Sequence, residues 1–215
     1  MLRIEQFVQG PKRMRILLLR HGETDWNLQG RCQGVTDLDL NERGRQQAVE
    51  VGKYLSGEKV DAIYSSDLKR ALQTAEAIRQ FHDLEITVDR DFRELNHGEL
   101  EGLTFTDIRS FYPDFLTWWR SEPAQLIVPG GERLVDVEQR VWKGIERIVS
   151  SHSADEKVVV VSHNFPILAI LCRITGTPLN DYRAFRVEPC RLNHISYDHR
   201  EGWQILQINV WATPA

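Results

Sequence analysis

The sequence predicts an α/β fold built around a largely parallel sheet. Short runs rich in β-branched residues alternate with longer segments whose apolar residues recur at helical spacing, which is the pattern of βαβ units. No internal repeat or low-complexity tract interrupts this alternation. The length of 215 residues is enough for one domain with a sizeable core, so a single domain is expected.

The first half of the chain contains three expected strands and two expected helices. A continuous apolar run at 15–19 is typical of a buried strand, and a helix is expected over 41–55, beginning at an asparagine that fits an N-cap. The second strand is expected at 60–64. Residues 65–67 then offer N-cap candidates for the next helix, and a weaker third strand is expected at 85–88.

The second half begins with a less regular segment, 95–131, which is rich in aromatic residues. An amphipathic helix is predicted over 134–148, and the strand at 157–161 has the clearest pattern of all. Pro166 lies early in the helix that follows, where its missing N–H costs little. An antiparallel hairpin is expected between residues 195 and 208, at the edge of the sheet.

The composition restricts the ligands and the compartment. A formal net charge of −4 gives no basic field for nucleic acid or an anionic membrane, so an anionic ligand would need a local cluster of cations. Three cysteines without a CxxC pair argue against a disulfide scaffold or a cysteine-rich zinc site and favour the cytoplasm. Residues 1–13 are expected to form an N-terminal extension to one domain over 14–215.

Polar and charged side chains follow each expected strand of the parallel sheet. Arg20 and His21 follow the first strand, Arg70 the second, Glu94 the third and His163 the fourth. Because the carboxyl ends of parallel strands meet at one edge, these residues are expected to share a pocket. Guanidinium forks pair with phosphate oxygens, a neutral imidazole can attack phosphorus, and a carboxyl can protonate an alkoxide leaving group. The set predicts phosphoryl transfer.

The segments that carry these residues resemble the signature of the histidine phosphatase superfamily, also called phosphoglycerate mutase-like. The resemblance covers nearly the whole chain from Met14, and the segments occur in the family's order. They are LRHGETDWN at 19–27, DLNERG at 39–44, YSSDLKRA at 64–71, Glu94 with His97-Gly98, and VSH at 161–163.

The resemblance implies a three-layer α/β/α sandwich with a mostly parallel central sheet and an enzyme that needs no cofactor and no metal. It implies that His21 becomes phosphorylated, and that Glu94 gives a proton to the leaving group and then acts as base for water. It also implies that the phosphoryl group is held by Arg20, Arg70 and His163. The residues implied to contact the phosphoryl group or the substrate are Asn27, Gln33, Gly34 and Asn164.

The family divides between phosphatases and mutases. In the mutases Arg-His-Tyr follows the acid glutamate, whereas Leu95-Asn96-His97 follows it here and the middle segment is shorter. Both differences favour hydrolysis of small phosphate esters. The alternatives that stay open are a cofactor-dependent phosphoglycerate mutase and a non-catalytic phospholigand-binding protein. Asn164 stands where glycine is usual, and the aromatic residues of 95–131 are expected either to pack or to line the substrate entrance.

Overall fold

A computed structural model of the protein describes residues 13–210. Apart from Arg13, the expected extension over 1–13 lies outside the described residues, as does the end of the expected domain, 211–215. The centre is a six-stranded sheet in the order β3-β2-β4-β1-β5-β6, with four parallel strands and an antiparallel pair at one edge. The strands are β1 (Met14–Arg20), β2 (Ala62–Ser65), β3 (Ile86–Val88), β4 (Lys157–Ser162), β5 (Leu192–Asp198) and β6 (Gly202–Val210).

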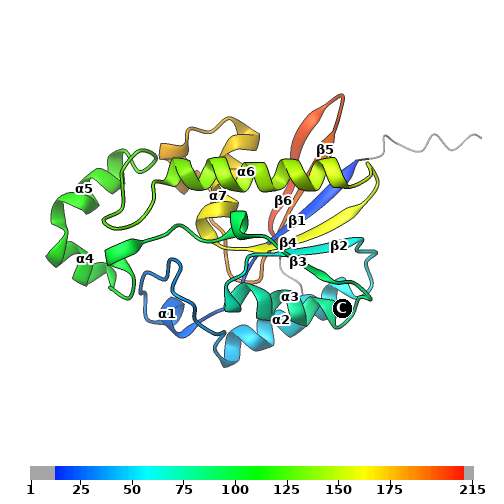
Figure 1. The fold of residues 1–215 in the computed structure, drawn as a ribbon, viewed down its shortest axis with the longest axis horizontal. Coiled ribbons are helices and arrows are strands. Elements are labelled where there is room, and N and C mark those ends of the chain that lie inside the picture. Colours follow the sequence, from blue (N-terminus) through cyan, green and yellow to red (C-terminus); the bar gives the residue numbers. More distant parts are fainter. Residues whose placement is uncertain (1–12, 211–215) are drawn as a thin grey trace, which may run out of the picture.

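Helices cover both faces of the sheet, with α2 and α3 on one face and α6 and α7 on the other (Figure 1). The predicted three-layer α/β/α sandwich is therefore confirmed. The helices are α1 (Asp25–Leu28), α2 (Glu42–Leu55), α3 (Lys69–Arg79), α4 (Phe105–Phe111), α5 (Pro113–Ser121), α6 (Leu134–Ser151) and α7 (Asn164–Thr175), with short 3₁₀ turns η1 (Arg90–Phe92), η2 (Gly98–Leu100) and η3 (Leu179–Ala184).

The two central strands, β1 and β4, correspond to the continuous apolar runs of the sequence. Along β1, Ile16 and Leu18 face the core under α6 and α7, whereas Leu17 and Leu19 face the core under α2 and α3. A strand that is buried on both faces needs apolar residues at every position, so strict alternation disappears. The residues of β4 divide between the two cores in the same way.

The expected helix starts are correct in one case and wrong in another. Asn41 caps α2, because its side chain accepts the backbone N–H of Gly44 at 2.8 Å. The N-cap of α3 is Leu68, which has no side-chain capping bond, rather than a residue of 65–67. Asp67 is engaged elsewhere, because its carboxylate pairs with the guanidinium of Arg93 at 2.5 Å.

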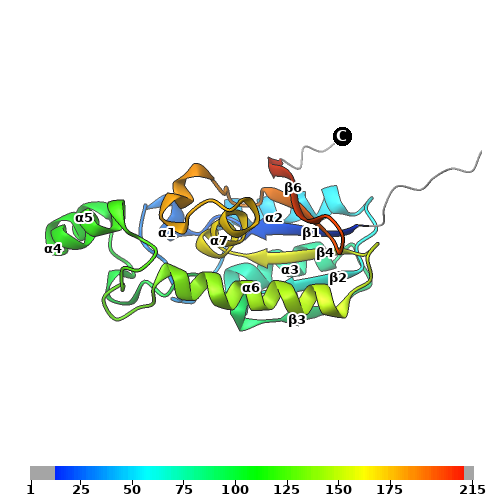
Figure 2. The same cartoon turned by 90° about the horizontal axis from the view of Figure 1, so that it is seen from above.

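The carboxyl ends of the parallel strands point toward one end of the molecule, where α1 lies and where the α4–α5 hairpin extends outward (Figure 2). Trp119 of this hairpin packs in the core, while Phe111 and Trp118 are exposed. The arrangement gathers the segments that follow β1, β2, β3 and β4 at a single edge.

Candidate active site

A polar hollow of about 220 Å³ opens at the carboxyl ends of the parallel strands. Seven residues predicted from the sequence line it: Arg20, His21, Asn27, Gln33, Gly34, Glu94 and Asn164. The other two predicted residues, Arg70 and His163, are fully buried next to His21 and do not line the hollow. Arg31 and Cys32, which sequence reasoning missed, also line it; their position directly before Gln33 was the available signal. Of segment 95–131, His97 lines the hollow, whereas the aromatic residues of α4 and α5 do not.

His21 directly follows β1 and is almost fully buried. Its Nδ1 lies 2.7 Å from the carbonyl oxygen of Gly22, which can only accept a hydrogen bond, so we place the ring proton on Nδ1. Its Nε2 therefore carries a lone pair, which accepts the Nε–H of Arg70 at 3.2 Å. Burial, then the charges of Arg70 and Arg20, hold the pKa of His21 well below its usual 6.5, so the imidazole is neutral at pH 7.

Arg70, in the first turn of α3, is completely buried and contacts His21 through its Nε. Its two terminal nitrogens donate to the carbonyl oxygens of Thr36 at 2.9 Å and Gly34 at 2.7 Å. Burial lowers the pKa of Arg70 to about 10, while the charge of Glu94 opposes the shift. The guanidinium therefore remains cationic at neutral pH and is fixed on three sides.

The loop that holds Arg70 is itself held by Glu101. The carboxylate of Glu101 accepts the backbone N–H groups of Val35 and Thr36, both at 2.8 Å. Gly34 must be glycine here, because its φ is +53° and a Cβ would lie 1.9 Å from Oε1 of Glu101. Glu101 thus fixes the backbone carbonyl groups that orient the arginine.

Arg20 and His163 complete the cluster of cations and imidazoles. One terminal nitrogen of Arg20 donates to the carbonyl oxygen of Val187 at 2.8 Å, and its Nε has no partner within residues 13–210. His163 is the fully buried N-cap residue of α7, with its ring centroid 5.0 Å from that of His21. Burial, then the charge of Arg70, holds the pKa of His163 well below 6.5.

Glu94 faces this cluster from the segment after η1 and is buried. Its carboxylate accepts the backbone N–H groups of Leu95 at 2.9 Å, Asn164 at 3.0 Å and Phe165 at 3.1 Å. Two of these groups belong to the N-terminal turn of α7, where the helix dipole also favours an anion. The carboxylate therefore has a fixed place beside the hollow.

Arg140 of α6 holds the backbone that carries Glu94. It donates to the carbonyl oxygens of Asp91 at 2.8 Å, Arg93 at 2.7 Å and Glu94 at 2.9 Å. Its other partner is Glu132 at 2.7 Å, which also accepts the backbone N–H of Asn96 at 2.9 Å. Sequence reasoning missed this ion pair, because Glu132 and Arg140 are eight residues apart and Glu132 lies before α6, so helical spacing does not indicate the contact.

Asn27 and Gln33 line the polar hollow, and both are hydrogen-bonded to Thr24. Oδ1 of Asn27 accepts both the backbone N–H and the hydroxyl of Thr24, each at 3.1 Å. The side-chain amide of Gln33 donates to the same hydroxyl oxygen. Two of the predicted substrate-contacting residues, Asn27 and Gln33, are therefore held in place by Thr24.

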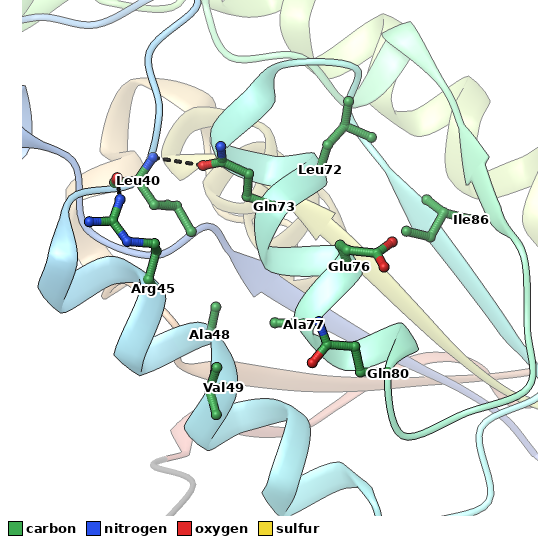
Figure 3. Close-up of a pocket in the computed structure, with 10 residues that line it drawn as sticks. All are labelled: Leu40, Arg45, Ala48, Val49, Leu72, Gln73, Glu76, Ala77, Gln80 and Ile86. Carbon is green, nitrogen blue, oxygen red and sulfur yellow. Dashed lines mark hydrogen bonds between the residues drawn. The ribbon is translucent and has the colours of Figure 1, made fainter.

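A larger hollow, of about 530 Å³, lies between α2 and α3, away from this site (Figure 3). It is lined mainly by aliphatic side chains and alkyl stems, and its lining contains no histidine, cysteine or serine. Gln73 closes one end by accepting the backbone N–H of Leu40 at 2.8 Å. The lining offers no nucleophile for chemistry.

Two negative findings apply to residues 13–210. Within that range no group of three or more histidine, cysteine, aspartate or glutamate side chains is placed to hold a metal ion. None of the helices described there combines the length and the apolar character that crossing a bilayer requires.

The chain is similar to known proteins along most of its length. The model of the histidine phosphatase superfamily (branch 1) matches residues 16–210. Phosphoserine phosphatase 1 of Hydrogenobacter thermophilus is 36% identical over 197 residues, which are 92% of each chain. Phosphoglycerate mutase-like protein 4 of Arabidopsis thaliana is 37% identical over 183 residues, 79% of each.

A solved structure agrees with this assignment. The native structure of a mycobacterial glucosyl-3-phosphoglycerate phosphatase aligns with a TM-score of 0.84 at 31% identity, covering 93% of this chain and 100% of that one. The resemblance drawn from the sequence is thus confirmed by a family model, by relatives and by fold. The chain belongs to the histidine phosphatase superfamily.

Proposed function

We propose that this protein hydrolyses small phosphate monoesters through a phosphohistidine on His21. The phosphatase names of similar proteins support the reaction class. The observation that carries the proposal is the state of His21: Gly22 holds Nδ1 at 2.7 Å, so the lone pair of Nε2 is available beside Arg70. A neutral imidazole in a cationic pocket suits attack on an anionic phosphorus centre.

In the first step we assign attack on phosphorus to Nε2 of His21, with cleavage of the P–O bond to the alcohol. For this step Glu94 carries a proton, which the negative charge of the bound ester favours against the helix dipole, and it gives that proton to the departing alkoxide, which leaves as the alcohol. Once Nε2 is bonded to phosphorus it no longer accepts the Nε–H of Arg70, whose donor then turns to a phosphoryl oxygen. Arg20 and His163 are the other groups proposed to hold that phosphoryl unit.

In the second step we assign water activation to the Glu94 carboxylate, which takes a proton as the water oxygen bonds to phosphorus. The N–P bond breaks, and His21 regains its neutral form with the lone pair on Nε2. The proton taken from water replaces the one given to the alcohol. Each cycle therefore consumes one water and releases one alcohol and one orthophosphate.

The mutase alternative needs cationic side chains that clamp a bisphosphate beyond the reacting phosphoryl group. Leu95, directly after Glu94, is fully buried in the core and cannot serve as such a clamp. One similar protein is named as phosphoglycerate mutase-like, so the mutase reaction is an alternative that needs a test. The test is 3-phosphoglycerate with a bisphosphate primer: release of inorganic phosphate supports a phosphatase, whereas formation of the isomer supports a mutase.

The remaining parts of the proposal concern ligand and setting. We propose a small-molecule phosphate ester as substrate, because the hollow of about 220 Å³ is small and polar. We further propose that turnover is metal-independent, that the protein works in the cytoplasm, and that it has neither nucleic-acid nor membrane partners. Addition of EDTA is expected to leave turnover unchanged.

The deciding experiment is a panel of phosphate esters with the wild type, His21→Asn and the exposed control His199→Asn. Wild type and control are expected to release phosphate and, after rapid quenching, to retain acid-labile phosphate on the chain. His21→Asn should lose both, with a fall in kcat/KM of at least roughly 10⁴-fold, since the covalent route is removed. Turnover by His21→Asn near the wild-type rate would reject the mechanism.

A further inference from the structure

His163 has one ring nitrogen engaged by protein and one that is not. Its Nε2 lies 2.9 Å from the hydroxyl oxygen of Ser66, the residue that follows β2. Its Nδ1 is buried and has no hydrogen-bond partner within residues 13–210. Ser66 and His163 are both completely buried, so bulk water does not supply hydrogen-bond partners to the ring nitrogens of His163.

The proton on the Ser66 hydroxyl decides which ring nitrogen of His163 carries hydrogen. The hydroxyl oxygen already accepts the backbone N–H of Leu68 at 3.3 Å. Its own proton has one acceptor in reach among its recorded contacts, which is Nε2 of His163. If Nε2 carried the hydrogen, the serine would accept twice and its buried O–H would be left without an acceptor, which is costly.

We propose that Ser66 is a positioning residue that fixes His163 as the tautomer with hydrogen on Nδ1. In that tautomer the unpartnered nitrogen is a donor, ready for a phosphoryl oxygen. In the opposite tautomer a lone pair would face that oxygen and repel it. The inference rests on the proposed function for its purpose, but the tautomer itself is a property of the protein without ligand.

The direct test is the tautomer of His163 in the wild type. Long-range ¹H–¹⁵N correlation spectra of histidine-labelled protein at pH 7.5 distinguish hydrogen on Nδ1 from hydrogen on Nε2. The signals of His163 are identified by their loss in His163→Gln. Because burial holds the pKa of His163 well below 6.5, the neutral ring is observed at this pH. Hydrogen on Nδ1 is expected, and hydrogen on Nε2 would overturn the proposal.

The matched variants are Ser66→Ala and Ser65→Ala. Ser65 is a buried neighbour whose hydroxyl donates to the carbonyl oxygen of Ser66 at 2.8 Å and makes no recorded contact with His163. Ser66→Ala should move His163 toward the Nε2 tautomer and lower kcat/KM by about 10- to 100-fold. That is less than the roughly 10²–10³-fold cost of deleting a preorganised donor, because the productive tautomer remains partly populated.

The other outcomes separate positioning from simple packing. Ser65→Ala should leave the tautomer unchanged and kcat/KM within about twofold, and Ser66→Thr, which keeps the hydroxyl, should recover the Nδ1 tautomer. An unchanged tautomer in Ser66→Ala, or equal losses in both alanine variants, would overturn the proposal. The spectrum can be recorded even if the protein hydrolyses no ester. Failure of the proposed function is therefore distinguishable from failure of the proposal about the tautomer of His163.

Discussion

Two hollows within residues 13–210 differ in size and in chemistry, and the smaller of these two is the proposed active site. The hollow between α2 and α3 has about 530 Å³ and a mainly aliphatic lining, whereas the hollow at the strand ends has about 220 Å³ and polar walls. Only the second places buried imidazole and guanidinium groups against one another, as with His21 and Arg70 at 3.2 Å. Convergent polar groups, rather than volume, therefore mark the reactive place.

The two hollows also differ in how the side chains that line them are held in place. In the polar hollow, side chains are fixed by partners far along the chain: Glu101 fixes the loop that orients Arg70, and Arg140 fixes the backbone of Glu94. Such preorganisation lets charges act on a reacting group without rearranging first. The charged side chains in the lining of the aliphatic hollow, Arg45 and Glu76, pair with neighbours on their own helices, Glu42 and Arg79, each at 2.7 Å.

Among the variants that test this comparison, the largest effect is expected from Arg70→Lys. A lysine ammonium cannot reach Nε2 of His21 and two carbonyl oxygens with a fixed fork, so kcat/KM should fall by roughly 10²–10³-fold. Steady-state kinetics on the best ester of the panel measure it. Arg79→Lys is the control, since Arg79 lies on the same helix but pairs with the half-exposed Glu76. A loss below fivefold for Arg70→Lys would contradict a role in gripping phosphate.

A smaller loss is expected from Arg140→Gln, which leaves the phosphoryl grip intact and loosens the backbone of Glu94. A shift of about 1 Å in a proton donor can cost up to roughly 10²-fold, so kcat should fall by about 10- to 100-fold with little change in KM. Arg147→Gln is the matched control, because Arg147 lies on α6 and pairs with Asp89 and Asp91 but not with residue 94. Equal losses of kcat in the two variants would show that any ion pair on α6 affects turnover, and would contradict a specific role for Arg140.

The buried imidazoles predict a loss of stability in mild acid. The pKa values of His21 and His163 are held well below 6.5, first by burial and then by Arg70. The unfolded chain therefore binds more protons, so the stability present above pH 6.5 is lost as the pH falls toward the folded pKa values. The slope is at most about 1.4 kcal/mol per pH unit for each histidine. Urea unfolding at pH 7.5, 6.5 and 5.5 measures it.

The control for this prediction is the exposed His199. His163→Gln should flatten the pH dependence of the unfolding free energy, whereas His199→Gln should leave it as in the wild type. A free energy of unfolding that stayed constant between pH 7.5 and 5.5 would contradict neutral, buried imidazoles.

The smallest effect is expected in the aliphatic hollow. Val49→Ser changes a side chain that is 39% exposed in the lining of that hollow. The change should shift the unfolding free energy by about 0.5 kcal/mol or less and leave kcat/KM within about twofold. A tenfold loss of activity would mean that the two hollows are coupled, and the contrast drawn between them would then fail.

The sequence alone determined the order of strands and helices and the gathering of His21, Arg70, Glu94 and His163. Apolar periodicity identifies the elements, and parallel strands must end at one edge, so residues that follow those strands meet whatever the details of packing. The sequence therefore predicts which residues lie together at the ends of the parallel strands.

Tertiary structure alone decided what holds those residues in place. The bond between Ser66 and His163 joins positions 97 apart, and that between Arg140 and the backbone of Glu94 joins positions 46 apart. The N-cap of α3 at Leu68 also escaped prediction, because Asp67 pairs with Arg93 instead of capping the helix. Periodicity reports which face a residue occupies, but a side-chain hydrogen bond depends on register and rotamer, which are fixed when the layers pack.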